Sequence, residues 1–258
     1  MSASEPQVAR AVMLVARKAA RRMVMAGAEG VALMGSHVRG DAHAESDVDV
    51  LAVGRGPAYT LRRSGGILLA ETWKTRAQCL REMRTPHQAG WAVPGWREAI
   101  VLADPGGVAR ELRRRAERWS WAAIASRSDA WAADEITGFA EEVHKLAGAI
   151  LAGQWQRAAI VRNVIAIRMA PLMSVRRRVL YASENLVHDV MAAEMGELWE
   201  STQHTALALR GESTAHSCAA ALRLYAIAAA ELRPLLDRRQ RAVVDHACAL
   251  AADACATT

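Results

Sequence analysis

Apolar residues recur along this chain in two different patterns, and the change between them divides the sequence near residue 125. Before about residue 105, short apolar runs are bounded by glycine, proline and aspartate, as is typical of β-strands. After Ser128 the apolar positions follow helical spacing, which predicts helices at about 129–152, 154–173, 175–200, 202–211, 214–232 and 236–256. The pattern therefore predicts an α+β chain, with a sheet-containing domain at 1–125 and an all-α helical bundle at 126–258.

Turn signals divide the N-terminal part into shorter elements. Glycines at 27 and 30 end a predicted helix over 5–27, and Gly65-Gly66 forms the turn of a predicted hairpin. Prolines at 86 and 94 predict an irregular segment over 85–95. The remaining elements are strands at 31–35, 47–53, 59–63, 67–74 and 98–103, and helices at 76–84 and 108–124.

The stretch from Gly35 to Val50 carries the clearest chemical signal. Asp47 and Asp49 stand at i and i+2 at the start of a predicted strand, so their side chains point to the same face. Two neighbouring carboxylates are the hard oxygen ligands that Mg²⁺ prefers. The groups that can approach phosphate are the flexible Gly35, the hydroxyl and N–H of Ser36, Arg39, and Ser46 beside the aspartates. The stretch therefore predicts a magnesium–nucleotide site.

A third carboxylate on a neighbouring strand would complete such an ion site. Glu71 is the only acid in the strand-like run 67–74. An acid within an apolar strand is costly unless it is paired or binds a metal. We therefore expect Glu71 to be the third ligand.

The residues Gly35-Ser36, Arg39-Gly40 and Ser46-Asp47-Val48-Asp49 resemble the signature of the DNA polymerase β-type nucleotidyltransferase superfamily. The layout is similar to its antibiotic-modifying members, the aminoglycoside and lincosamide nucleotidyltransferases, which have a mixed-sheet domain followed by a helical, substrate-binding domain. The resemblance implies transfer of AMP from ATP, or of another nucleotide, to a hydroxyl of a small molecule such as an aminoglycoside, with release of pyrophosphate. It further implies that Ser36 and Ser46 contact phosphate and that Asp47, Asp49 and Glu71 hold Mg²⁺.

The base that activates the acceptor hydroxyl has more than one candidate. Glu71 can serve in addition to binding metal, and so can Glu141 or Glu142 in the helical domain. Glu141 and Lys145 lie four residues apart on one helix face, where Lys145 can reach a phosphate. A surface ion pair is the more ordinary interpretation of that spacing.

Composition and charge bear on the partners and the cellular location that we expect for this protein. The net charge of +6 leaves nucleic-acid binding open without favouring it, and the basic run Arg110 to Arg118 is typical of a solvated helix face. The four cysteines lack metal-ligand spacing, no basic leader opens the chain, and no uninterrupted apolar run reaches the ~20 residues of a membrane span. We expect a cytoplasmic protein that does not contact a membrane, and the possibility of a homodimer stays open.

Two other functions compete with small-molecule modification. One is nucleotidyl transfer to a protein or a tRNA, as in an AMPylator or a toxin–antitoxin component. The other is a binding module with a vestigial site. The intact Ser46-Asp47-Val48-Asp49 and the acid at Glu71 argue against a vestigial site, and the fused helical domain argues against a minimal antitoxin.

Overall fold

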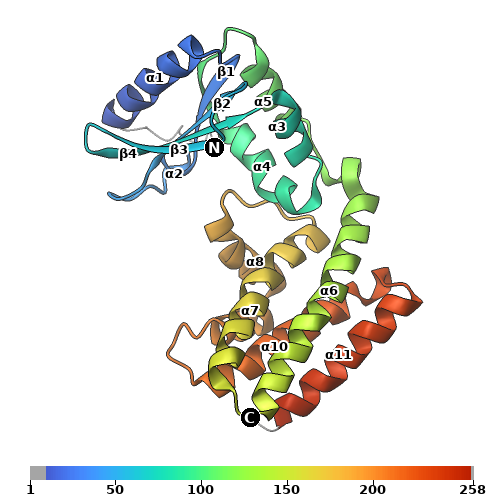
Figure 1. Cartoon of the computed structure of the whole chain (residues 1–258). Helices are drawn as coiled ribbons and strands as arrows, with labels where there is room; N and C mark the ends of the chain where they lie inside the picture. Colours follow the sequence, from blue (N-terminus) through green and yellow to red (C-terminus); the bar gives the residue numbers. More distant parts are fainter. Residues whose placement is uncertain (1–9, 257–258) are drawn as a thin grey trace. The chain divides into compact units, whose positions relative to one another are not determined.

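The computed structural model describes residues 10–256, and it divides into two compact units. The first ends at Ala123 and the second begins at Ile124. Figure 1 shows the strands in the first unit, in blue to teal, and the helices of the second in green to red. The predicted succession of a mixed sheet and a helical region is confirmed.

A five-stranded sheet in the order β3-β4-β2-β1-β5 forms the centre of the first unit. Neighbouring strands are antiparallel except β2 and β4, which are parallel. Each predicted strand is present within a few residues: β1 Gly30–Met34, β2 Val48–Val53, β3 Tyr59–Ser64, β4 Ile67–Lys74 and β5 Ile100–Ala103.

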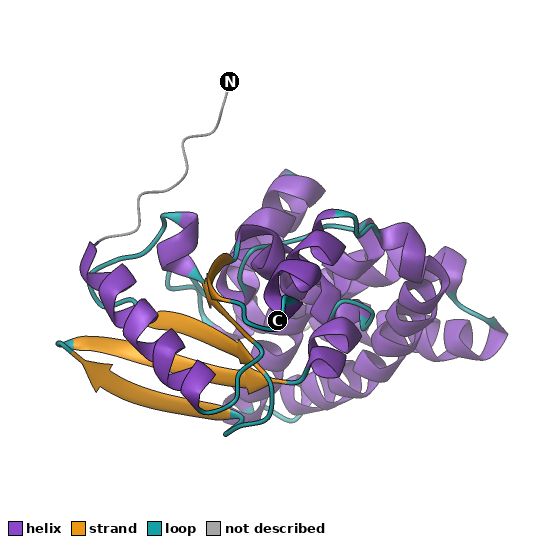
Figure 2. Ribbon diagram, turned by 90° about the horizontal axis from the view of Figure 1, so that it is seen from above, coloured by secondary structure: helices purple, strands orange, loops and turns teal. Residues whose placement is uncertain are grey.

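Helix α1 (Arg10–Met25) covers one face of this sheet, as Figures 1 and 2 show. Its buried positions repeat at helical spacing and pack on alternate residues of β1 and β2, among them Val31, Leu33, Val48 and Val50. Residues 5–9 of the predicted helix lie outside the described part of the chain. The strand residues between these core positions, including Asp49, face the other side of the sheet.

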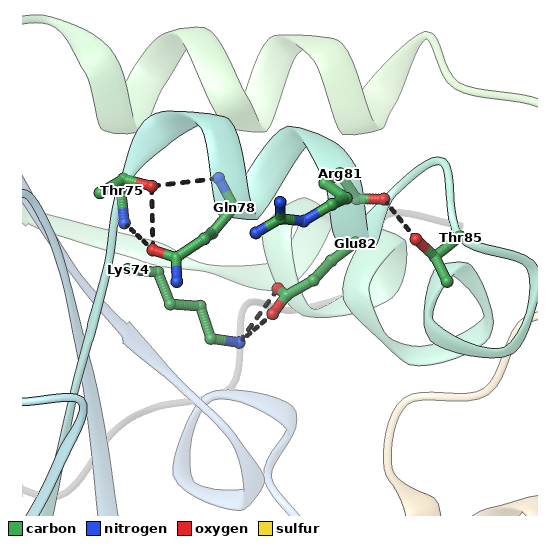
Figure 3. Close-up of polar contacts among 6 residues, drawn as sticks. All are labelled: Lys74, Thr75, Gln78, Arg81, Glu82 and Thr85. Atoms are coloured by element: carbon green, nitrogen blue, oxygen red, sulfur yellow. Dashed lines mark hydrogen bonds and ion pairs between the residues drawn. The ribbon is translucent and has the colours of Figure 1, made fainter.

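Three helices follow β4 and β5: α3 (Arg76–Glu82), α4 (Pro86–Glu98) and α5 (Val108–Glu117). Thr75 caps α3 in a reciprocal pair with Gln78, each side chain accepting a hydrogen bond from the other residue's backbone N–H (Figure 3). Lys74, at the end of β4, forms an ion pair with Glu82 at 2.8 Å. These contacts join α3 to the end of the sheet.

Helix α4 corrects the prediction of an irregular segment over 85–95. Pro86 occupies the first turn, where its missing N–H costs nothing, and only Pro94 lies inside the helix. Ala89, Val93 and Trp96 are buried along one side of α4. Burial of this side outweighs the single backbone hydrogen bond that Pro94 cannot make.

The second unit is a helical bundle. Its interior includes Tyr225, whose hydroxyl donates to the carbonyl of Ile136 at 3.2 Å, and Trp199, whose Nε1–H donates to Gln203 at 2.9 Å. The helices are α6 Ala125–Leu151, α7 Trp155–Arg177, α8 Val187–Met195, α9 Glu197–Ala206, α10 Thr214–Leu232 and α11 Arg238–Ala256.

The single helix predicted over 175–200 is wrong. Helix α7 ends at Arg177, and Arg178 takes a left-handed conformation at φ 62°. The Arg178 guanidinium donates to the carbonyl of Val175 and pairs with Asp129, so side-chain contacts favour the break. The sequence Arg176-Arg177-Arg178 did not predict such a C-cap, because it contains no glycine or asparagine.

Helix α7 is long and apolar enough to cross a membrane by length and composition alone. The sequence pattern had not predicted a segment that is apolar enough for a membrane span at this position. Half of its most apolar window is buried within the second unit. A helix at the core of a bundle has the same composition.

Candidate active site

The turn after β1 brings Gly35 directly against Asp49. Gly35 has a φ of +80°, which L side chains rarely adopt, and a Cβ at this position would overlap Asp49 Oδ2. After Gly35 the chain forms the short helix α2 (Ser36–Arg39), which ends at Gly40 in the left-handed conformation. Glycine is therefore required for the backbone to pass the carboxylate.

Asp49 is a half-buried carboxylate without a protein partner. Within residues 10–256, neither Asp47 nor Asp49 forms a hydrogen bond or an ion pair through its carboxylate. Burial, followed by the charge of Asp47, raises the pKa of Asp49 to about 6, and Arg39 offsets part of this effect. Two close carboxylates that no ion pair or hydrogen bond satisfies fit a divalent cation.

Backbone and side-chain hydrogen bonds hold the loop between α2 and β2. Ser46 Oγ accepts from the N–H of His43 at 2.9 Å, and the N–H of Ser46 donates to the His43 carbonyl at 3.0 Å. Arg39 Nε donates to Asp41 at 3.2 Å. Ser36, Arg39 and Ser46 belong to the same short segment as the two aspartates, and their contact with phosphate stays a prediction.

Glu71 does not join them, and its assignment as a metal ligand is wrong. In the parallel pairing of β2 and β4, Glu71 stands opposite Val50, so it shares the face that α1 covers. It is 4% exposed and forms ion pairs with Arg22 of α1 and with Arg62 of β3 at 3.2 Å. The burial of this acid was predicted correctly, but two arginines satisfy it instead of a cation.

The position on β4 that faces the same side as Asp49 is Ala70. Among residues 10–256, no three His, Cys, Asp or Glu side chains gather as a metal-binding group. The carboxylates of the first unit that could hold a cation are therefore Asp47 and Asp49.

Glu141 and Lys145 lie on α6 in the second unit. Lys145 pairs with both Glu141 and Glu142 at 2.8 Å, and the Glu141 side chain is 73% exposed. The hydrogen bond from Lys145 lowers the pKa of Glu141. This is the geometry of the surface ion pair that the spacing allowed, and a role in catalysis or phosphate binding stays a prediction.

Glu98, at the end of α4, is a carboxylate near the motif that the sequence did not single out. Burial raises its pKa, Arg39 opposes that shift, and Asp41 adds to it. It lines a cavity together with Val38 and Arg39 of α2. Its position depends on α4 being a helix, which the prolines concealed, so no local sequence signal could have identified it.

The strand–turn–strand geometry and the paired aspartates can now be compared with known families. Residues 16–82 match the family model described as a nucleotidyltransferase domain. The first unit contains a nucleotidyltransferase domain. The match covers about a quarter of the chain and includes the Gly35-Ser36 turn, both aspartates and all of β4. No curated protein matches the chain.

The nucleotidyltransferase domain makes this chain a transferase of phosphorus-containing groups. Such enzymes use a nucleoside triphosphate and, in general, a divalent metal. In this structure, the neighbouring Asp47, Asp49 and Gly35 are the residues whose chemistry suits a divalent metal and a triphosphate.

Proposed function

We propose that this protein transfers a nucleoside monophosphate, AMP from ATP, to a hydroxyl of a small molecule and releases pyrophosphate. The observation that carries the proposal is Asp49: a half-buried carboxylate beside Asp47, with no ion pair of its own within residues 10–256, against a glycine that leaves room for it. In this proposal Asp47 and Asp49 hold Mg²⁺. A bound divalent ion neutralises charge on the α-phosphate and on the leaving pyrophosphate.

The residues of the turn bind and orient the triphosphate. Gly35 allows the backbone to approach it, and Ser36 offers its hydroxyl and an N–H at the start of α2. Ser46 Oγ already accepts the His43 N–H, so its own O–H is available to donate to a phosphate oxygen. In this proposal Arg39, whose charge acts on both Asp49 and Glu98, contacts phosphate as well.

The proton of the acceptor hydroxyl needs a carboxylate base. Glu98 joins the candidates in the helical domain, Glu141 and Glu142, and it differs from Glu141 in basicity. Lys145 lowers the pKa of Glu141, which makes it a weaker base. Burial raises the pKa of Glu98, which makes it a stronger one, and Glu98 lies beside Arg39 of the motif. We therefore place the base at Glu98, with Glu141 as the alternative.

A matched pair of substitutions distinguishes these bases. We expect Glu98→Gln to lower kcat about 100-fold or more, the usual contribution of a general base, and to remove the acidic limb of the pH–rate profile. Glu141→Gln should leave kcat within about twofold, since it removes an exposed ion pair. The reverse outcome, a large loss in Glu141→Gln alone, would assign the base to the helical unit.

The acceptor class is tested by labelling. Aminoglycosides are the class to which the sequence resemblance points, and a protein or tRNA hydroxyl is the alternative. The full chain is incubated with each α-labelled NTP and, separately, with aminoglycosides, lincosamides, bulk tRNA and cell lysate. Label on a small molecule, strongest with ATP, supports the proposal, whereas label confined to protein or RNA contradicts it.

A further inference from the structure

A cavity of about 910 Å³ lies beside the motif in the first unit. Its wall runs along β5, the last strand of the sheet, which pairs with β1 on one edge and with no strand on the other. Val38 and Arg39 of α2 form one side, and the arginines of α5 form another. The volume is within the range of sites that bind small molecules.

The charge of this cavity is strongly positive. Five arginines line it, against two glutamates: Arg39, Arg97, Arg110, Arg113 and Arg114, with Glu98 and Glu117. The basic run of α5 is exposed, as expected, and three of its arginines also line this open cavity: Arg110, Arg113 and Arg114. Several guanidinium groups around one cavity raise the local positive potential and attract anions.

Some of these arginines are held in place by the fold. Arg97 donates to the carbonyls of Ala116 at 2.8 Å and Trp119 at 2.9 Å. Arg113 pairs with Glu117 at 3.1 Å, and Arg110 pairs with Asp104 at 3.1 Å.

Arg114 differs from these. Within the described residues its guanidinium forms no hydrogen bond or ion pair. Arg114 is exposed at the cavity, so its donors can reach a ligand, and they suit bidentate binding of a phosphate.

We propose that this cavity binds the phosphate group of a small, hydroxylated, phosphate-bearing acceptor. The assignment as an acceptor site rests on the proposed function, whereas the preference for an anion rests on the arginines alone. A polycationic aminoglycoside would meet five arginines in this cavity and would be repelled. The acceptor is therefore better described as a phosphorylated polyol or sugar than as a cationic drug.

Binding can be measured without turnover in an Asp49→Asn chain. The probes are ribose 5-phosphate and inorganic phosphate, compared with ribose and with kanamycin, by calorimetric titration. We expect ribose 5-phosphate to bind and ribose and kanamycin to bind at least tenfold more weakly. Added to Asp49→Asn, Arg114→Ala should weaken ribose 5-phosphate about tenfold, and Arg114→Glu more, because a charged hydrogen bond is lost. Arg118→Ala, an exposed arginine near the end of α5 that does not line the cavity, should change nothing.

A separate measurement excludes the nucleotide as the occupant. With otherwise unsubstituted chains and Mg²⁺, Arg114→Glu should leave the Kd of ATP unchanged. Equal loss of ATP and ribose 5-phosphate affinity would assign the cavity to the triphosphate and overturn the proposal. So would failure of both phosphate compounds to bind, tighter binding of kanamycin, or an effect of Arg118→Ala as large as that of Arg114→Ala. If only the proposed function is wrong, the result is different: no pyrophosphate is released from any NTP, but ribose 5-phosphate still binds.

Discussion

Asp49 shows how a single residue can be unfavourable for the fold and necessary for the site. Its carboxylate is half-buried and has Asp47 as a like-charged neighbour. It packs against Gly35 and accepts no hydrogen bond from the described residues. Such a group lowers stability when it is ionised. The face to which Asp49 points was predictable from strand alternation, whereas Asp47 lies just before β2, which begins at Val48. The cost of Asp49 was not predictable, because burial depends on elements far away in the chain.

The first prediction concerns the stability of the metal-free protein. The pKa of Asp49 is about 6 in the fold against an ordinary value of 3.8. A raised acid pKa contributes stability that is complete below about pH 3.8 and is lost as the pH rises through about 6. At pH 8 without metal, Asp49→Asn should therefore be more stable than the unsubstituted protein, by up to about 3 kcal/mol.

Urea unfolding in EDTA at pH 8 and at pH 4 measures this difference. The extra stability of Asp49→Asn should shrink towards zero at pH 4. The comparison of the two proteins at pH 4 therefore serves as the control. Equal stability of the two proteins at pH 8 would mean that Asp49 is solvated or paired, contrary to the structure.

Gly35 allows a second test at the residue scale. Gly35→Ala introduces strain at positive φ, about 1–2 kcal/mol, and also pushes a methyl group into Asp49. Gly65→Ala is the matched control, because Gly65 also has positive φ but nothing within 4 Å of its Cβ. Gly35→Ala should lose more stability than Gly65→Ala, measured by urea unfolding, because only its methyl group meets another atom, and only Gly35→Ala should lose transferase activity. Equal activity of the two variants would show that Gly35 does not position the carboxylate.

At the scale of elements, local sequence patterns predicted the strands well but failed to predict helix α4. Apolar runs and the Gly65-Gly66 turn predicted every strand, whereas α4 was missed because its prolines are tolerated through burial of Trp96 and Val93. Glu71 was assigned to the wrong face for a related reason. The register of a parallel pair comes from long-range contacts, and a shift of one residue moves a side chain to the opposite side of the sheet.

The ion pairs of Glu71 lead to a third prediction. Glu71→Gln removes the charge that holds Arg22 of α1 and Arg62 of β3, so the first unit should lose roughly 1–3 kcal/mol of stability. The affinity for Mg²⁺, measured by calorimetry, should stay within about twofold of the unsubstituted value, because Glu71 faces away from Asp49. A tenfold loss of Mg²⁺ affinity in a folded Glu71→Gln protein would restore it as a metal ligand.

For the whole molecule, the two units differ in how much the sequence revealed about their function. The family match and the motif both fall in the first unit, where strand geometry converts spacing into a site. Helical periodicity in the second unit predicted a bundle and little more, because any amphipathic helix meets that pattern. The proposal for the donor half of the reaction therefore comes from residues 35–49 of the sequence, whereas the proposal for the acceptor rests on the arginine-lined cavity.

The central claim is that Asp47 and Asp49 support metal-dependent nucleotidyl transfer. Its most direct test is pyrophosphate release from ATP by the full-length protein and by Asp49→Asn, with Mg²⁺ and in the presence of an accepted acceptor. Loss of a metal ligand should lower the rate at least about a thousandfold, while circular dichroism and unfolding show an intact and, at pH 8, more stable fold. Full pyrophosphate release by the folded Asp49→Asn protein would contradict the account.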